Sequence, residues 1–147
     1  MKAIYNLDDP FWGVNTLEEL KNAVEEFHAS IGVNASVAID GESVVAEHAD
    51  RSDIDAEEDT RIIVSFCNSR RFGKAHKVLG KLLSAWPGDD NAHRLLAQVL
   101  MEEEKFDAAI KECEIALKLN PRNEFSMILM GNLLSRDKGN PAEGIGW

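Results

Sequence analysis

The sequence predicts a mainly α-helical protein built from a repeated helical hairpin, preceded by a small segment of mixed helix and strand. Three observations lead to this fold class. Apolar and turn-forming residues recur at a fixed interval, and runs with helical spacing fill each interval. Near the N-terminus, one Asp-Gly pair separates two short β-prone runs. A fixed period of about 34 residues is typical of arrays in which each unit buries its apolar face on its neighbour.

The repeat is visible in residues of similar type that recur one period apart. Pro87 and Pro121 stand one period apart, and both follow a stretch of helical periodicity. Proline cannot continue a helix, so each marks the end of one unit. The same interval links further apolar or small residues, namely Phe72 with Phe106, Ala75 with Ala109, Ile63 with Ala97 and Gly131, and Phe66 with Leu100 and Leu134.

Residues 1–55 form a small acidic segment that stands apart from the repeats. Residues 1–15 contain turn formers and aromatic side chains, which predicts an irregular arm. Thr16 and Glu19 have the spacing of a capping box, so a helix is expected from there to about Ser30. The Asp40-Gly41 pair then predicts a β-hairpin, although a helix after Gly41 remains an alternative.

The stretch from Asp50 to Asp59 is crowded with acidic residues. Alternating acids resemble the start of a calcium-binding loop, but the glycine and the terminal glutamate of such a loop are missing at the required positions. A solvated linker leading to a helix from about Glu57 is the better interpretation. No metal site is predicted.

The array itself is expected over residues 56–147, with repeats at about 56–89 and 90–123 and a partial repeat at 124–147. Each full repeat has an apolar helix, a short turn and a second helix that ends at proline. We expect Asp90 or Asn91 to cap the first helix of the second repeat. In the third repeat the turn at Gly139 comes one residue late, and the second helix begins near Ala142 and reaches Trp147.

These residues resemble the tetratricopeptide repeat family. The small residues Ala97 and Gly131, the aromatic residue Phe106 and the terminating Pro121 stand at the positions that the family prefers. The resemblance covers about residues 56–147 and is most specific in the second repeat. It implies a right-handed α-α superhelix of helical hairpins whose function is protein–protein interaction. Trp147 has no place on the motif.

The family resemblance also implies a site. Its members hold a peptide or protein in a concave groove lined by the first helix of each repeat. Carried over residue by residue, the groove would be lined by Thr60, Val64, Cys67, Asn91, Arg94, Gln98, Met101, Phe125, Ile128 and Asn132. The lysine and asparagine clamp with which one branch of the family holds carboxylate tails is absent, because Thr60 and Val64 replace its first pair.

Charge is distributed unevenly. Residues 1–59 hold 15 of the 26 acidic residues and only 3 of the 16 basic ones. This balance argues against nucleic acid as a partner of the N-terminal segment. Basic residues gather on one predicted helix face at Arg70, Lys74, Lys77 and Lys81. That face is expected to be solvated, with docking of the acidic half of the chain as the main alternative. An acidic partner or nucleic acid could also bind there, but no base-stacking aromatic residues accompany it, so nucleic acid is not the expected partner.

Catalysis has no support in the sequence. The four histidines are scattered, Cys67 and Cys113 are isolated thiols, and no phosphate-binding loop is present. We therefore expect a non-enzymatic, cytoplasmic adaptor or scaffold that has no cofactor and no membrane-spanning segment and binds a protein or peptide partner. The alternative is a self-assembling structural module, a homo-oligomer in which another copy or further repeats cover the unfinished C-terminal end.

Overall fold

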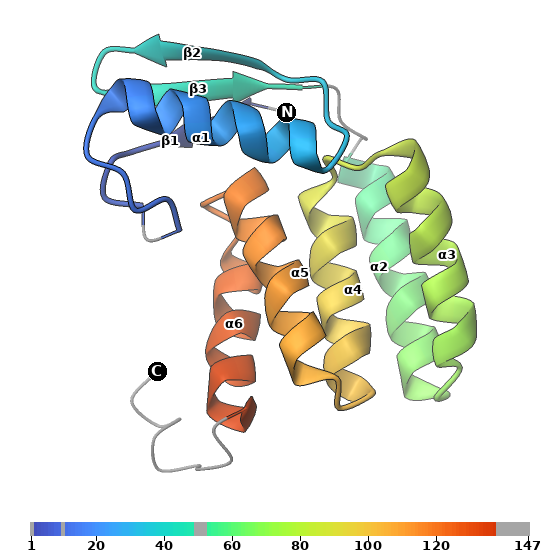
Figure 1. The fold of residues 1–147 in the computed structure, drawn as a ribbon. Coiled ribbons are helices and arrows are strands. Elements are labelled where there is room, and N and C mark those ends of the chain that lie inside the picture. Colours follow the sequence, from blue (N-terminus) through green and yellow to red (C-terminus); the bar gives the residue numbers. More distant parts are fainter. Residues whose placement is uncertain (1, 10, 49–52, 138–147) are drawn as a thin grey trace.

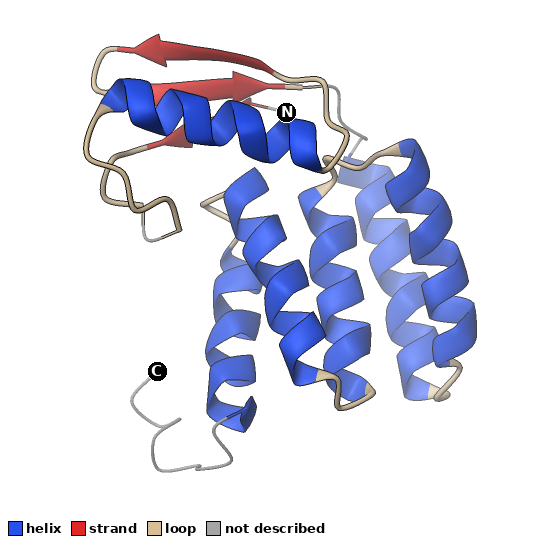
Figure 2. Ribbon diagram, viewed as in Figure 1, coloured by secondary structure: helices blue, strands red, loops and turns tan. Residues whose placement is uncertain are grey.

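The computed structural model describes residues 2–9, 11–48 and 53–137. A three-stranded sheet with one helix against it lies across one end of a row of helices (Figure 1). Colouring by secondary structure separates the two parts clearly, because all described strands belong to the N-terminal unit (Figure 2). The predicted fold class, a helical repeat array preceded by a small α+β segment, is confirmed.

The N-terminal unit contains the strands β1 (Lys2–Tyr5), β2 (Ser36–Asp40) and β3 (Ser43–Glu47) and the helix α1 (Leu17–Ser30). The sheet is antiparallel in the order β1-β3-β2. The prediction that residues 1–15 form only an irregular arm was wrong, since Lys2–Tyr5 pairs with β3. A lone hairpin is marginally stable, and the added strand gives it a third member and a broader apolar face.

The sequence predicted the hairpin at the right position in the chain, but its two-residue loop is shifted by one residue. Asp40 is the last residue of β2 and pairs with Ser43, so Gly41 and Glu42 form the loop between the strands. Gly41 has a φ of +62°, a conformation that glycine adopts without steric cost.

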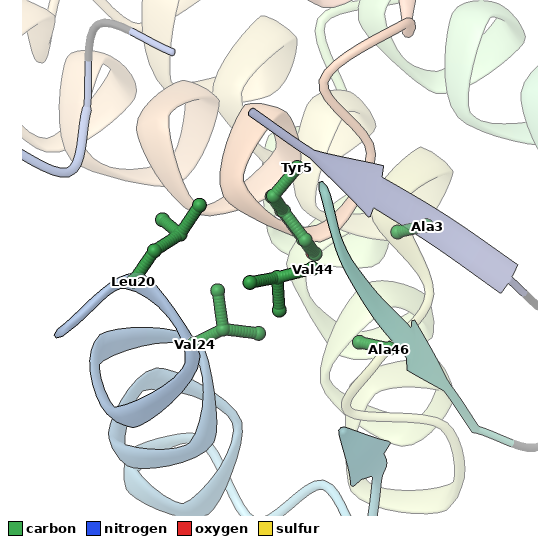
Figure 3. Close-up of a cluster of buried hydrophobic side chains, with 6 residues drawn as sticks. All are labelled: Ala3, Tyr5, Leu20, Val24, Val44 and Ala46. Carbon is green, nitrogen blue, oxygen red and sulfur yellow. The ribbon is translucent and has the colours of Figure 1, made fainter. Parts of the chain in front are cut away.

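The core of the N-terminal unit lies between the sheet and α1. Leu20 and Val24 of α1 face Tyr5 and Val44 of the sheet, and all four side chains are fully buried (Figure 3). Each such burial contributes roughly 1.5–3 kcal/mol relative to an exposed side chain. The helix begins as expected, because the Thr16 hydroxyl accepts a hydrogen bond from the Glu19 backbone N–H at 3.1 Å.

The array consists of α2 (Asp53–Asn68), α3 (Phe72–Ala85), α4 (Asp90–Glu102), α5 (Phe106–Leu119) and α6 (Glu124–Asp137). The acidic stretch expected as a linker as far as Glu57 is instead helical from Asp53. Acidic residues are favoured in the first turn of a helix, because the N-terminal end of a helix carries a partial positive charge. The second helix predicted for the third repeat, from about Ala142, lies outside the described residues.

Small side chains are found where the helices cross. Ala75, Ala97, Ala109 and Ala116 are all completely buried, and larger groups there would hold the paired helices apart. The turns inside the two full repeats also match, because Arg70 and Glu104 both have a positive φ, of 57° and 64°. These two residues stand one period apart, so equivalent positions of the two repeats share the same unusual backbone conformation.

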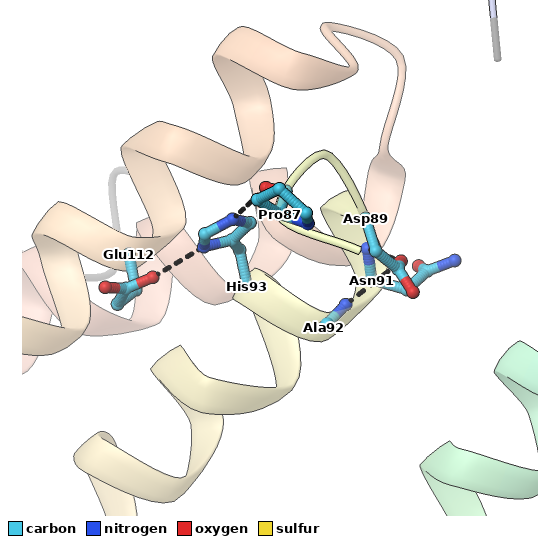
Figure 4. A network of polar contacts seen from close by, with 6 residues as sticks. All are labelled: Pro87, Asp89, Asn91, Ala92, His93 and Glu112. Carbon is cyan, nitrogen blue, oxygen red and sulfur yellow. Dashed lines mark hydrogen bonds and ion pairs between the residues drawn. The ribbon is translucent and has the colours of Figure 1, made fainter. Parts of the chain in front are cut away.

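The start of α4 is fixed by a buried polar network (Figure 4). Asp89, and not Asp90 or Asn91, is the N-cap, with its carboxylate accepting hydrogen bonds from the backbone N–H groups of Asn91 and Ala92. The His93 ring joins the Pro87 carbonyl and the Glu112 carboxylate, each at 2.8 Å. His93 thereby links the turn after α3, the first turn of α4 and the middle of α5.

The sheet unit is attached to the array at the end of α5. The Tyr5 hydroxyl donates to the backbone carbonyls of Lys118 and Leu119. The Lys118 ammonium lies over the rings of Trp12 and Phe27, at 5.4 Å and 5.7 Å from their centres. The unit thus supplies partners for the last carbonyls of α5, which have no partner within their own helix.

Candidate partner-binding groove

The first helices of the three repeats form one continuous face. Helix α4 packs against α2 on one side and against α6 on the other, while α3 and α5 form the second layer. This is the arrangement that the groove prediction requires, because residues one period apart then repeat across neighbouring helices.

The predicted groove residues fall into two groups by exposure. On α6, Phe125, Ile128 and Asn132 are exposed. On α2 and α4, Arg94 is buried, and the remaining six residues are half-buried: Thr60, Val64, Cys67, Asn91, Gln98 and Met101. The groove face is therefore mostly closed along α2 and α4 and presents its apolar side chains on α6.

Phe125 and Ile128 are the most exposed large apolar side chains of the described chain, at 68% and 64% of their full accessible area. They are three positions apart on α6, which places them on the same side of the helix. A pair of large apolar groups in contact with water is a common feature of interaction surfaces.

Arg94 is brought to Phe125 across the contact between α4 and α6. Its guanidinium carbon lies 5.2 Å from the centre of the Phe125 ring, a cation–π distance. The side chain is only 8% exposed. Burial lowers the pKa of Arg94, whereas the carboxylates of Asp90 and Asp89 act in the opposite direction. Arg94 therefore contacts the Phe125 ring and presents little of its charge to solvent.

The far end of this face is acidic. Burial raises the pKa of the Cys67 thiol, and the nearby charges of Glu102 and Glu103 raise it further. Glu103 also contacts His76 and, at 3.5 Å, the Lys105 ammonium, and the His76 hydrogen bond lowers the pKa of this carboxylate against a desolvation effect that raises it. The raised pKa keeps Cys67 a neutral thiol at neutral pH rather than a nucleophile.

Sequence reasoning missed one buried connection between the second and third repeats. The Asp90 carboxylate accepts hydrogen bonds from the side-chain amides of Asn120, at 3.1 Å, and Asn123, at 2.8 Å. The Asn123 side-chain oxygen in turn accepts from the Ser126 backbone N–H and so caps α6. The sequence signal was available in the two asparagines around Pro121, but their common partner became visible only in the fold.

A pocket lies on the opposite side of α6 from the groove. Its wall is formed by Trp12 and Phe11 of the loop before α1, Leu117 at the end of α5, and Met127 and Met130 of α6. Because successive helical residues are rotated by about 100° around the axis, Met127 and Met130 point away from the side that carries Phe125 and Ile128. The groove and the pocket are therefore separate surfaces.

The described residues contain no cluster of side chains that could bind a metal ion. Within residues 2–9, 11–48 and 53–137, no three histidine, cysteine or acidic side chains are grouped so that they could hold a metal ion. The Cys113 thiol donates to the Ser126 carbonyl at 3.1 Å, and burial raises its pKa to about 12. His28 and His93 are buried and bonded to the protein itself.

The basic residues on α3 and in the turn before it remain on the surface, since Lys74, Lys77 and Lys81 of α3 and Arg70 of the turn are all exposed. The N-terminal unit does not use this face for the attachment described above, which lies at Lys118 on α5. These residues are exposed, as expected for a solvated face, and the alternative, docking of the acidic half there, differs from the attachment that the structure has at α5. Among the described helices, none is long and apolar enough to span a membrane.

Comparisons with known proteins bear on the helical part. Residues 69–129 match a family model described as a tetratricopeptide repeat. A solved structure of a mutant of MamA is 20% identical, and the match covers 85% of this chain and 77% of that one with a TM-score of 0.47. No curated protein sequence matches this chain. The repeat period, the paired helices and the family match agree on one conclusion: residues 69–129 of this chain are tetratricopeptide repeat sequence.

Proposed function

We propose that this protein is a non-catalytic adaptor or scaffold that binds a segment of a protein partner on the face formed by α2, α4 and α6. The tetratricopeptide repeat is a protein-interaction fold, which supports the general class. The observation that carries the specific proposal is the exposure of Phe125 and Ile128 beside the buried Arg94.

The chemistry of this face suggests how the partner would be held. An apolar side chain of the partner would pack between Phe125 and Ile128 and remove both from water. Because Arg94 already holds the Phe125 ring from below, the ring loses little freedom on binding, and a preorganised anchor binds more tightly than a mobile one. The half-buried polar groups along α4, such as Gln98, would provide hydrogen bonds to the partner backbone.

The test uses a displayed library of random linear peptides selected on the complete protein. Phe125→Ala should weaken the selected peptides by about tenfold or more, which corresponds to losing about 1.4 kcal/mol of binding free energy. Met127→Ala is the matched control, since Met127 lies on the same helix but on its other side and is 49% exposed. Peptides that bind equally well to both variants would contradict the groove proposal.

Self-assembly is the second candidate, and the exposed outward side of α6 favours it. Met127 stands open on that side and borders an apolar pocket. Another copy could cover this surface. Light scattering across a range of concentrations decides the matter, because a stable dimer would support assembly and a monomer at all concentrations would exclude it.

A further inference from the structure

The strand β2 forms one edge of the N-terminal sheet. In the order β1-β3-β2 it is paired with β3 on one side, and no other described strand lies on its second side. Figure 1 shows β2 at the border of the unit away from the helical array, while β1 lies nearer the array. The strand β2 therefore presents a row of backbone N–H and C=O groups that no described strand pairs.

The register of the hairpin identifies which backbone groups point outward. A two-residue hairpin loop is closed by backbone hydrogen bonds between its flanking residues, here Asp40 and Ser43. Hydrogen-bonded and non-hydrogen-bonded pairs alternate along an antiparallel ladder, so Ala38 and Asp40 direct their backbone groups to β3. Val37 and Ile39 direct theirs away from β3, and these groups are available to another strand.

The sequence of β2 lacks the features that usually keep edge strands from pairing. Natural edge strands often carry a lysine, a proline or a bulge. The strand reads Ser-Val-Ala-Ile-Asp, and its pairing with β3 is continuous from end to end. Ala38 is exposed, and Ile39 is 40% exposed. The opposite edge differs, because β1 carries Lys2 and is attached to the array through Tyr5.

We propose that β2 of one copy pairs with β2 of a second copy, antiparallel and with twofold symmetry, in a register centred on Ala38. Ala38 then faces its own counterpart, Val37 faces Ile39 of the second copy, and Ser36 faces Asp40 of the second copy. Val37 and Ile39 become the hydrogen-bonded pairs of the new ladder, which uses the backbone groups that point outward. Two three-stranded sheets become one continuous sheet across an interface in which both copies use the same strand.

The side chains favour a second copy as the occupant of this edge. Val37 and Ile39 pair with core residues of β3 and lie on the α1 side of the sheet, so apolar side chains meet across the new ladder. The chain has a net charge of −10, and two copies repel one another in general. In this register, however, Asp40 faces the uncharged Ser36. The strand reads polar, apolar, small, apolar, polar in both directions, which makes it complementary to itself.

The pairing would leave the candidate groove available, because no groove residue belongs to β2. The array lies beyond β1, on the opposite side of the sheet unit from the new ladder (Figure 1). A pair of copies would then present the face of α2, α4 and α6 twice. Linked binding sites hold a partner with more than one recognition segment more tightly than a single site does. The pairing itself does not depend on the groove proposal.

The test introduces opposite charges at Ala38. Its side chain is exposed, so Ala38→Lys and Ala38→Glu should keep the fold, yet each variant places like charges directly opposite one another in the paired sheet. Sedimentation equilibrium of the complete chain should show a dimer, and each variant should raise the dissociation constant by about fivefold. An equal mixture of the two variants should dimerise at least as well as the parent, because opposite charges then face each other.

Ile4→Lys is the matched control. Ile4 belongs to the same cross-strand row, since it pairs with Val45, which pairs with Ala38, but it lies on β1 at the other edge. Its side chain is 39% exposed. The substitution adds the same charge to the same face of the sheet and should leave the dissociation constant unchanged. Circular dichroism verifies that every variant keeps its secondary structure.

Hydrogen exchange gives a second readout. The amides of Val37 and Ile39 should exchange more slowly as the protein concentration rises, whereas the amide of Ala38, which faces β3, should not respond to concentration. A parent chain that is monomeric at all concentrations would overturn the proposal. A dimer that neither Ala38 variant weakens would overturn it too, as would one that only Met127→Asp dissociates, because the interface would then lie on α6.

Discussion

The Arg94 guanidinium lies beneath the Phe125 ring, 5.2 Å from the ring centre, and joins the first helices of the second and third repeats. This contact makes the two residues one unit of the groove rather than two independent positions. Reversing the charge of Arg94 would disturb the fold, because the side chain is 8% exposed and close to Asp90. Binding studies should therefore change Phe125 and leave Arg94 in place.

A double-mutant cycle measures this contact. Combining Arg94→Met with Phe125→Leu should reveal a coupling energy of about 0.5–2 kcal/mol in the free energy of unfolding, the range from exposed to desolvated cation–π pairs, because Arg94 is buried and Phe125 is exposed. Urea titration of the parent, both single variants and the double variant gives the value. Arg94→Met with Asn132→Ala is the control cycle, and a coupling of similar size there would argue against a specific contact with the ring.

The attachment of the sheet unit should depend on one hydroxyl. Tyr5→Phe keeps the buried ring but removes the hydrogen bonds to the Lys118 and Leu119 carbonyls. We expect a loss of about 1–2 kcal/mol in the free energy of unfolding, the usual cost of leaving buried polar groups without a partner. Urea titration measures it. Faster hydrogen exchange at the end of α5 in the variant would locate the loss, and unchanged exchange there would contradict the role given to Tyr5.

The turn after α3 contains a glycine that has no room for a side chain. A Cβ at Gly88 would lie 2.8 Å from a ring carbon of His48 and 3.2 Å from a methyl group of Val33. Gly88→Ala should therefore destabilise the protein by about 1–3 kcal/mol, as overpacking does. Thermal unfolding monitored by circular dichroism provides the measurement.

Gly80 is the matched control for that substitution. It lies inside α3, and a Cβ there would meet nothing within 4 Å. Gly80→Ala should raise the free energy of unfolding by roughly 0.5–1 kcal/mol, because alanine is the better helix former. If both substitutions changed the free energy of unfolding equally, the close contacts of a Cβ at Gly88 with His48 and Val33 would not be the cause of its effect.

Stability should fall in mild acid because of His28. Burial lowers the pKa of His28, and the His48 charge acts in the same direction, while the hydrogen bond to the Val24 carbonyl opposes them. The unfolded chain therefore binds a proton at a higher pH than the folded one. The contribution of His28 is present above the ordinary pKa of about 6.5 and is lost as the pH falls from there toward the folded value.

Urea midpoints at pH 7.5 and pH 5.5 test this dependence. His28→Gln removes the titrating group, so the difference between the two midpoints should be smaller in that variant than in the parent chain. A difference of the same size in both proteins would assign the acid sensitivity to other groups.

The array was predictable from the sequence because its information is local and repeated. Each unit carries its own apolar spacing, small crossing residues and terminating proline, so Ala97 and Pro121 predicted their roles without knowledge of distant residues. The family match over residues 69–129 lies where these signals are strongest. The errors occurred at boundaries, where Asp53 rather than Glu57 opens α2 and Asp89 rather than Asp90 caps α4.

The N-terminal unit was harder to predict because its information is not local. Lys2–Tyr5 is too short to show a strand period by itself, and it becomes a strand only by pairing with β3, which lies beyond α1 in the chain. In the groove, the sequence could propose Arg94 and Phe125 as lining residues but could not show that one is buried beneath the other.

The sequence by itself determined the helices, their repetition and the small residues at the helix crossings. Helix formation and termination depend on neighbours within a few positions of the chain, so local patterns reveal them. The tertiary structure alone decided how the sheet unit attaches at Tyr5 and Lys118, and which side of α6 presents Phe125 to water. Those features depend on the energies of contacts between segments that are far apart in the chain or lie on different helices. No local pattern in the chain encodes them.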